Sequence, residues 1–546
     1  MEERGKNWMS LTRRLLILTP FFLFLFLFYI IPLLFLIGNV NQNDFISVLS
    51  DDYIHRLFYG TLAQAVLSTL ITLILSLPVA FFLAKYSFKG KRVLEYVLLT
   101  TFFVPGFTIA EGLIVLLGEK GIINSLLSQL LATGEPVVKI LYSIWAVVLA
   151  HVIYYVPLAT LILEQGFSSV NQDLVDAARV FSGSTLRVFK TVYLNFLTPY
   201  MGAASLLVFA FSFITYSTPM LVGGRFTTLE VEIYATKFKP VSSSIALLQL
   251  LLTLLVSIII ILFREKYYAP FSTSRPVEEP VSRLFSSPSG ILLAAYVAFI
   301  YVFELTPVAI PVISPFLETG RSFPGLFKEL YDFKFGFGLS FNEVLFQSLS
   351  IALIVSAVST LLSVAIVWSS KLSGGILEKI VSILMALPLT MSRSSLALGI
   401  LLSYGFGVTR LYGSWILMTI GQSAVVVPLA ARIIEASWSR VVKEYREAAD
   451  AHGATAFFRL VRVEMPLIMP AVVASLLMAF SSSLSDFTFS TFFSTLNLMT
   501  LPVAVNLLID YRRLNLALAL TSLLTMLVII VETAGSQFSK ERLRLI

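Results

Sequence analysis

The chain has 546 residues, of which 57% are hydrophobic and only 13% are charged, and its formal net charge is +7. Soluble domains carry about 25% charged residues, so this chain has too few charges to cover a water-facing surface. The composition therefore excludes a row of soluble domains, a disordered chain, a coiled coil and a soluble nucleic-acid-binding protein, and it predicts a polytopic membrane protein.

The residue types that hold metals and disulfides are scarce. Cysteine is absent, and the histidines, His55, His151 and His452, are far apart in the sequence. We therefore expect no disulfide, no metal site, no cofactor and no catalytic residue. The positive net charge fits loops on the cytoplasmic side of a membrane, which collect Lys and Arg, better than nucleic-acid binding.

The predicted elements are membrane-spanning helices, since backbone groups in lipid must be satisfied within their own segment. The first apolar stretch, Leu15–Ile37, follows basic residues and is longer than the core of a signal peptide, so we interpret it as a retained span. A window of about 20 apolar residues predicts an all-α membrane protein with about 12 transmembrane helices. The predicted spans are residues 14–38, 57–84, 96–118, 139–164, 201–222, 243–263, 289–314, 343–370, 380–404, 411–434, 470–494 and 514–532.

The distribution of Lys and Arg predicts the orientation. With the N-terminus inside, roughly two thirds of the 39 basic residues fall in segments that face the cytoplasm. This bias predicts a multi-pass protein of the cell membrane with both termini in the cytoplasm.

The second half of the chain resembles the first. Leu141–Trp145 (LYSIW) matches Leu411–Trp415 (LYGSW) at an offset of 270, and Pro157 matches Pro428 at 271. Each repeat holds six predicted spans, so the two repeats have the same orientation and are related by an axis along the membrane normal. We predict a first unit at 1–266, a Pro- and Ser-containing cytoplasmic linker at 267–288 and a second unit at 289–546.

One cytoplasmic loop in each repeat carries the most specific pattern. An acidic residue followed by two alanines stands 23 residues before a proline, from Asp176 to Pro199 in the first loop (165–200) and from Glu447 to Pro470 in the second loop (435–470). In the second loop, Gly453 can take a positive φ and end one short helix, and Thr455 can cap another. The predicted structure is a helix, a bend and a second helix on the cytoplasmic face.

These loops resemble the signature loop of type I ABC importer permeases, in which Glu-Ala-Ala is followed by Gly at +6 and by Pro at +19 and +23. In the second loop the matching residues are Glu447, Ala448, Ala449, Gly453, Pro466 and Pro470. In the first loop they are Asp176, Ala177, Ala178, Gly183 and Pro199. The first loop departs from the pattern, since Asp replaces Glu, the glycine comes one residue late and Asn195 replaces the first proline.

The resemblance implies that both loops are coupling helices seated in clefts of a cytosolic ABC ATPase dimer. It implies a fused permease that passes a small solute from a separate binding protein by alternating access, with ferric iron or thiamine as the substrates of the most similar fused permeases. Gly90–Arg92 does not complete a Walker A pattern, so we expect hydrolysis in a partner subunit. The external segments are too short for a substrate domain, so the expected partners are the ATPase dimer, an extracytoplasmic solute-binding protein and membrane lipid, but no nucleic acid.

Charges inside predicted spans need a reason, because each costs about 2.5–3.5 kcal/mol at the bilayer centre. Glu111, Arg393 and Asp486 are such charges and are candidates for the translocation pathway. Glu111 and Arg393 follow matching prolines of the two repeats, so we hypothesise that they pair across the repeat axis. The alternatives are a salt bridge that only fixes helix packing and, for Asp486, packing through the serines at 481–483.

Two other classes of protein remain open at this point. An ion-coupled secondary transporter also often has twelve spans in two halves, although it gives no reason for the paired Ala-Ala loops. A membrane scaffold or sensor predicts no solute flux.

Overall fold

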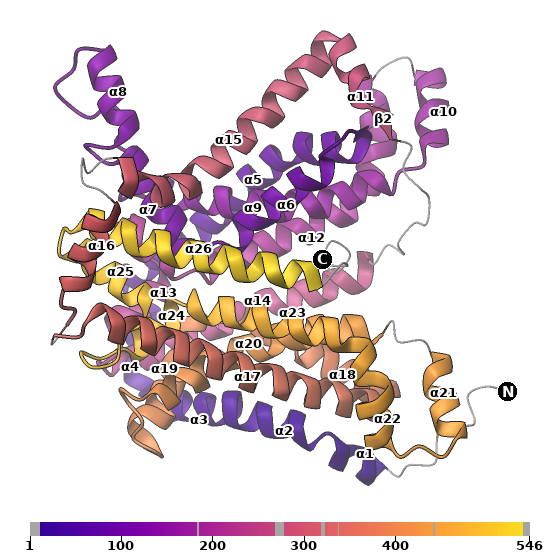
Figure 1. Ribbon diagram of the computed structural model, residues 1–546, viewed down its shortest axis with the longest axis vertical. Coiled ribbons are helices and arrows are strands. Elements are labelled where there is room, and N and C mark those ends of the chain that lie inside the picture. The colour runs from indigo at the N-terminus through magenta and orange to yellow at the C-terminus, as the bar shows by residue number, and fades with distance from the viewer. Residues whose placement is uncertain are drawn as a thin grey trace. The chain divides into compact units, whose positions relative to one another are not determined.

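A computed structural model describes residues 11–182, 185–267, 278–317, 323–336, 338–439 and 443–538 of the protein. The described residues are mostly helical (Figure 1). The named strands among them are two of two residues each, β1 (Tyr86–Ser87) and β2 (Glu279–Pro280), which pair in parallel. The predicted all-α class is thus confirmed. Both chain ends lie outside the described residues.

Ten helical segments are long and apolar enough to cross a membrane, or eleven if one bent pair counts as a single span, in the part of the chain that the structure describes. Each corresponds to a predicted span. The continuous spans are Thr19–Gly38 (α2, π-helix η2 and α3), α5 (Asp52–Lys85), α9 (Ile144–Ser168), Phe189–Phe213 (π-helix η3 and α12), α14 (Val241–Tyr267), α15 (Pro288–Leu317), α17 (Phe341–Ser373), α20 (Trp415–Trp438), Ala456–Leu484 (α22, π-helix η8 and α23) and α26 (Leu514–Phe538).

Shorter elements connect or flank these spans. They are α1 (Leu11–Ile17), α4 (Gln42–Ser50), α8 (Ile122–Leu130), α10 (Gln172–Ser182), α11 (Thr185–Val188), η4 (Pro219–Gly223), α13 (Leu229–Ala235), η5 (Val281–Ser286), α16 (Phe323–Asp332), α21 (Lys443–Ala451), α24 (Thr488–Phe493) and α25 (Leu501–Asp510).

The third and ninth predicted spans, which match each other in the repeats, are broken. In the third, α6 (Lys91–Phe103) and α7 (Gly106–Leu117) are separated at Pro105, whose ψ of 131° is not helical. The ninth consists of α18 (Gly375–Leu384), a 3-10 turn containing Pro388, α19 (Arg393–Ile400) and η7 (Leu401–Gly407), with a bend of 96°. Proline lacks the N–H that a helix needs and disfavours helical geometry in the residue before it, which explains a break at each site.

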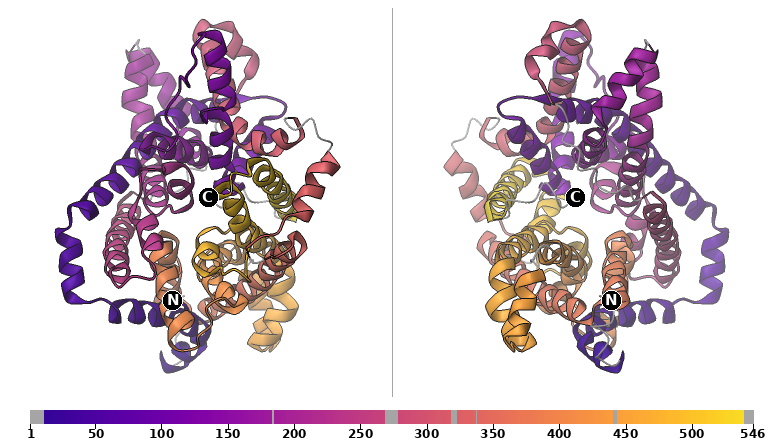
Figure 2. Two further views of the ribbon diagram at one scale, coloured as in Figure 1. Left: turned by 90° about the vertical axis from the view of Figure 1, so that its left-hand side faces the viewer. Right: turned by 90° about the vertical axis from the view of Figure 1, so that its right-hand side faces the viewer.

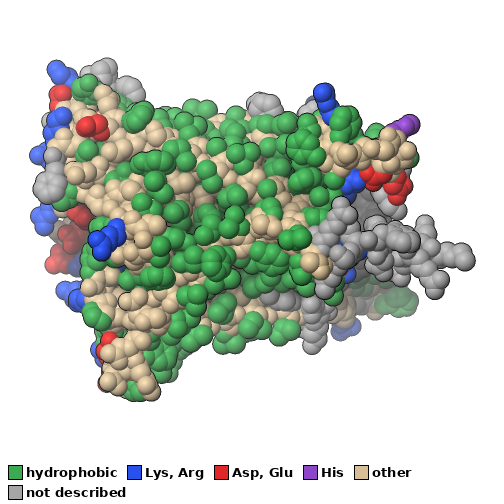
Figure 3. Space-filling model, turned by 90° about the horizontal axis from the view of Figure 1, so that it is seen from below, with side chains coloured by type: hydrophobic (Ala, Val, Ile, Leu, Met, Phe, Trp, Pro, Cys, Tyr) green, Lys and Arg blue, Asp and Glu red, His purple; other side chains and the backbone are tan. Residues whose placement is uncertain are grey.

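The side chains on the face shown in Figure 3 are arranged as a membrane protein requires. Hydrophobic side chains cover the middle of this face, and Lys, Arg, Asp and Glu gather toward its two ends (Figure 3). Apolar side chains in contact with lipid and charges near the interfaces are the expected distribution for a protein that spans a bilayer.

The chain folds into two compact units that cut across the sequence repeats. Unit 1 contains residues 1–44, 236–247 and 324–546, and unit 2 contains residues 45–235 and 248–323. The first span of the chain is therefore grouped with the helices of the second repeat, and α15, the first span of the second repeat, is grouped with the helices of the first. The predicted boundaries at 266 and 289 describe the repeats and not these compact units.

In unit 1, two tyrosine hydroxyls fasten the first span to the second repeat. The Tyr29 hydroxyl donates to the carbonyl of Ala424 in α20. Ala424 lies four residues before Pro428, so its carbonyl has lost its helical donor. The Tyr404 hydroxyl of η7 donates at 2.7 Å to the carbonyl of Leu27 in η2. Figures 1 and 2 show the indigo N-terminal helices lying beside these orange helices of unit 1.

We expect Tyr29→Phe and Tyr404→Phe each to destabilise the protein by about 0.5–2 kcal/mol, since each removes a donor from a backbone carbonyl in an apolar environment and keeps the ring. The measurement is the apparent melting temperature in detergent. Tyr59→Phe is the control, because that side chain is 65% exposed. Equal melting temperatures for all three variants and the parent chain would show that the two hydroxyls do not hold the first span.

In unit 2, α5, α9 and α12 pack around a core that includes Leu163, Leu197 and Val208. The helices α7 and α15 approach very closely, because a Cβ built on Gly112 would lie 1.9 Å from the carbonyl oxygen of Pro307. The described end of the linker is attached to this unit through the β1–β2 pair and an ion pair of 2.8 Å between Lys91 and Glu278.

Candidate functional site

The second loop has the predicted helix–bend–helix geometry. Helix α21, which carries Glu447, Ala448 and Ala449, ends at Ala451, and Gly453, two residues later, turns the chain with a φ of +75°. The Thr455 hydroxyl then accepts a hydrogen bond of 3.3 Å from the Phe458 N–H and caps α22. Both predictions for this bend are confirmed. Two prolines follow within α23, Pro466 in its first turn and Pro470 one turn later.

The first loop repeats this order of elements. It consists of α10 with Asp176, Ala177 and Ala178, then α11, η3 and finally α12 with Pro199. Both loops enter the following span through a five-residue π-helix, η3 (Phe189–Tyr193) and η8 (Leu460–Glu464), at an offset of 271. Gly183, the candidate bend residue of the first loop, lies outside the described residues. The shared order of elements shows that the sequence repeat is also a structural repeat.

Both loops present apolar side chains at their surfaces. Phe181 in α10 is 90% exposed, and Phe457 and Phe458 in α22 are 68% and 55% exposed. Phenylalanine side chains in a loop of this kind need a surface that covers them. The described part of the chain does not cover these three, so they are available to a partner surface.

Asp486, one of the three charges predicted inside spans, lies at a break between α23 and α24 in unit 1. Its carboxylate accepts a hydrogen bond of 3.0 Å from the Ser490 N–H and one of 3.5 Å from the Gln422 amide. The Ser483 hydroxyl donates to the same Gln422 side chain. This network links α20, α23 and α24, so Asp486 is tied to helix packing as well as being a pathway candidate.

Arg393 and Glu111 fall in different compact units. Arg393 is the first residue of α19, directly after the break in the ninth span, and its side chain is exposed. Glu111 is buried in α7 of unit 2, one residue before the close contact at Gly112. Arg393 and Asp486 thus belong to the same compact unit, and a pair between Arg393 and Glu111 remains a hypothesis.

Further acids in predicted spans, Glu304 and Glu532 among them, are not among the sequence candidates. Glu304 is buried in α15, and its two carboxyl oxygens have no hydrogen-bond partner within the described part of the chain. Glu532 in α26 accepts a hydrogen bond from the Ser481 hydroxyl of α23. Both lie within ranges predicted to span, so the same search for charges in spans would have found them.

Lys237 lies between α13 and α14, near the end of α24. Its sequence context does not distinguish it from an ordinary charge in a loop. Its ammonium donates to the carbonyls of Thr491 and Phe492 at 3.2 and 3.4 Å, in the same unit. It also lies 5.7 Å from the ring centre of Phe492. Burial lowers the pKa of Lys237 to about 8. The contact holds the start of α14 to the end of α24, just after Asp486.

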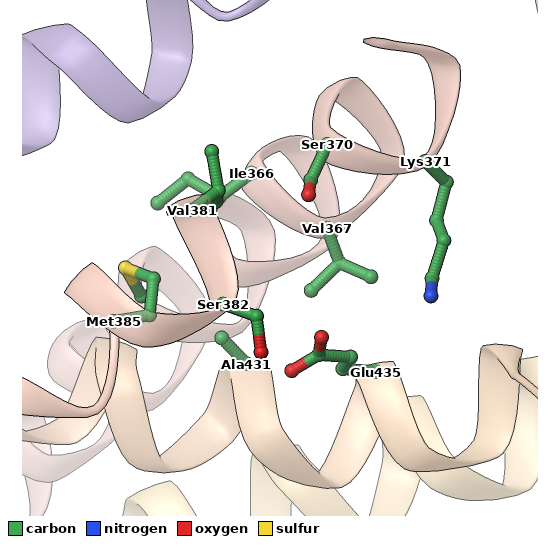
Figure 4. Close-up of a pocket in the computed structure, with 9 residues that line it drawn as sticks. All are labelled: Ile366, Val367, Ser370, Lys371, Val381, Ser382, Met385, Ala431 and Glu435. Atoms are coloured by element: carbon green, nitrogen blue, oxygen red, sulfur yellow. The ribbon is translucent and has the colours of Figure 1, made fainter. Parts of the chain in front are cut away.

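A shallow pocket in unit 1 lies between α17, α18 and α20 (Figure 4). Its polar side chains include Lys371, Ser382 and Glu435. Beside it, the Arg432 guanidinium donates to the hydroxyl and the carbonyl of Ser382, at 3.0 and 2.7 Å. Lys371 forms an ion pair of 2.6 Å with Glu378 of α18. The Arg432 contacts attach α18, the first part of the broken ninth span, to α20, which precedes the second loop, and the ion pair attaches α18 to α17.

The repeat of the chain, the paired loops and the broken third and ninth predicted spans define the class of a polytopic membrane transport subunit. The family model of the binding-protein-dependent transport system inner membrane component matches the chain twice, at residues 76–267 and 360–542. The chain belongs to this family and is a fused two-unit permease of the type I ABC importer class, located in the membrane as a multi-pass protein.

Individual relatives are similar along most of their length. A probable ABC transporter permease protein of Sinorhizobium fredii is 24% identical, over 86% of this chain and 85% of its own. A thiamine transport system permease protein of Escherichia coli is 23% identical over 85% of each chain, and one of Brucella abortus is 25% identical over 89% of each. The secondary-transporter alternative is not favoured by these similarities.

Proposed function

We propose that this permease works with a cytosolic ABC ATPase dimer and an extracytoplasmic solute-binding protein, and that its own chain carries no ATPase activity. Both chain ends and both loops face the cytoplasm in this proposal. The first and second loops are the coupling loops, and the contacts with the ATPase are made by Asp176–Pro199 and Glu447–Pro470. The observation that carries the proposal is the paired order of helix, short helix, π-helix and span in the two loops.

The proposed substrate is thiamine or a solute of similar size. The names of two relatives support thiamine, and their similarity extends over 85% and 89% of this chain. Ferric iron, which the resemblance of the sequence also implies, is the second candidate.

The test is reconstitution of the permease in vesicles with its ATPase and binding protein. We expect uptake of radiolabelled thiamine to require ATP and the binding protein and to persist when an ionophore collapses ion gradients. Uptake without the ATPase, stopped by the ionophore, would instead establish an ion-coupled transporter. ATP-dependent uptake of ferric iron but not of thiamine would correct the substrate and leave the mechanism in place.

We also propose that Glu111, Arg393 and Asp486 line the translocation pathway. If Glu111 and Arg393 pair, Glu111→Arg and Arg393→Glu should each lower transport about tenfold or more, since each leaves an unmatched charge in an apolar region. The double swap should then recover most of that loss. The measurement is the transport rate of the single and double variants. A double variant that transports no faster than the slower single variant would show that Glu111 and Arg393 do not pair.

A further inference from the structure

The two coupling loops have matching backbones but different side chains at the positions that hold each loop together. At an offset of 271 the matched positions are Val175 and Arg446, Arg179 and Asp450, Val188 and Arg459, and Tyr193 and Glu464. Three of these four pairs exchange an apolar or aromatic residue in the first loop for a charged residue in the second. The comparison concerns each loop within its own unit.

In the second loop the charged residues converge on one carboxylate. Glu464, at the end of η8, has a side chain that is only 3% exposed. Its Oε1 lies 3.0 Å from Nε of Arg446 in α21 and 3.4 Å from Nε of Arg459 in α22. Arg459 also donates from Nη1 to both carboxylate oxygens of Asp450, at 2.5 and 2.7 Å. The ion network thus joins the coupling helix, the short helix and the entrance of the span.

In the first loop the same places are filled by an apolar cluster. Val175 in α10 and Val188 in α11 are buried together with Val170, and Tyr193 packs against them. An ion pair in this loop, between Asp176 and Arg179 at 3.4 Å, has both side chains more than half exposed. An exposed pair of this kind contributes about 0–1 kcal/mol, so apolar packing is what holds the first loop.

We propose that Arg446, Arg459 and Glu464 are positioning residues that seat the second coupling loop through an ion network centred on the buried carboxylate of Glu464, whereas the first loop is seated by apolar packing. This inference rests on the coupling role proposed above. Removing one member of a buried network leaves the remaining charges without compensation, but replacing the whole network by a well-packed apolar set can be neutral. The second loop therefore depends on every member of the network. The first loop shows that the same backbone positions can instead be held together by apolar side chains.

The absence of cysteine from the sequence makes the seating of each loop measurable in the full chain. A single cysteine at His452 or at Phe181 carries a spin label that reports the mobility of the second or the first loop. We expect Glu464→Gln to raise label mobility at 452 but not at 181. With the ATPase and binding protein present, it should lower the solute carried per ATP about fivefold to tenfold, since two arginines lose their carboxylate.

The variant Arg446→Val/Arg459→Val/Glu464→Tyr places the first loop's residues in the second loop. In this variant the label mobility at 452 should return to the low value of the parent chain, and the solute transported per ATP should be within about twofold of the parent value. If the triple variant fails to fold, the label mobility at 452 can be compared between Arg446→Lys and Arg446→Gln. This is a milder test, because only lysine retains the charge. Glu135→Gln, which breaks an ion pair with side chains 81% and 62% exposed, controls for charge removal.

Unchanged label mobility at 452 in both Glu464→Gln and Arg446→Gln would overturn the inference. So would a folded triple variant whose label at 452 is as mobile as in Glu464→Gln. The mobility measurement needs no ATPase, so it can fail while ATP-driven transport stands. Conversely, it can succeed even if the coupling role is refuted.

Discussion

Replacing Glu447 and Gly453 by alanine is expected to lower the solute transported per ATP by about tenfold or more. A tenfold loss corresponds to about 1.4 kcal/mol of coupling free energy. Gly453 takes a φ of +75°, where an L-residue with a Cβ is strained by roughly 1–2 kcal/mol, and no other atom would contact that Cβ within 4 Å. The exposed Glu447 lies on α21, the proposed coupling helix, which ends two residues before Gly453.

The measurement compares ATP hydrolysis with solute uptake in the same vesicles, and immunoblotting of membranes confirms that the chain is inserted. We expect hydrolysis to continue while uptake falls, which is uncoupling and not loss of the protein. Gly134→Ala is the control, since a Cβ there also meets nothing within 4 Å and the residue lacks a positive φ. Normal uptake by the double variant would count against the coupling role of the second loop.

Gly112→Ala is expected to destabilise the protein by about 3 kcal/mol and to reduce its amount in the membrane. The added Cβ would lie 1.9 Å from the Pro307 carbonyl oxygen and 2.7 Å from its carbon, and these are backbone atoms that cannot move independently. Helices α7 and α15 would have to separate, which loses the close packing that holds membrane helices together. Glu111, the neighbour of Gly112, would be displaced with α7.

The check is the melting temperature of the purified chain in detergent, together with its yield from membranes. Gly38→Ala is the control, because this glycine is also in a helix of a span, at the end of α3, and nothing lies within 4 Å of an added Cβ. Equal melting temperatures for the two variants would mean that α7 and α15 are not held by this contact.

The spans and the loop bends follow from local properties of the chain. A membrane helix needs only a run of about 20 apolar residues, so hydropathy alone located the ten segments that the structure forms. Gly453 and Thr455 could be assigned as the bend and the cap because a positive φ and an N-cap are requirements of the adjacent backbone.

The breaks in the third and ninth spans were not predicted, although Pro105 and Pro388 mark both. Proline occurs inside continuous spans as well, as at Pro78, Pro157 and Pro428. Neighbouring helices and side chains can satisfy the groups that a proline frees, as Tyr29 does for Ala424. Whether a proline breaks a span therefore depends on contacts with other helices, which hydropathy does not contain.

By itself the sequence determined the all-α membrane class, the two repeats, the family and the positions of both loops, because each depends on residues close together in the chain. Only the tertiary structure decided that the first span of each repeat joins the unit of the other, and that Arg446 and Arg459 converge on Glu464. Lipid is as apolar as the helices, so hydrophobicity does not select a partner for a span. The choice falls to close packing, as at Gly112 and Pro307, and to hydrogen bonds between distant residues, as from Tyr404 to Leu27.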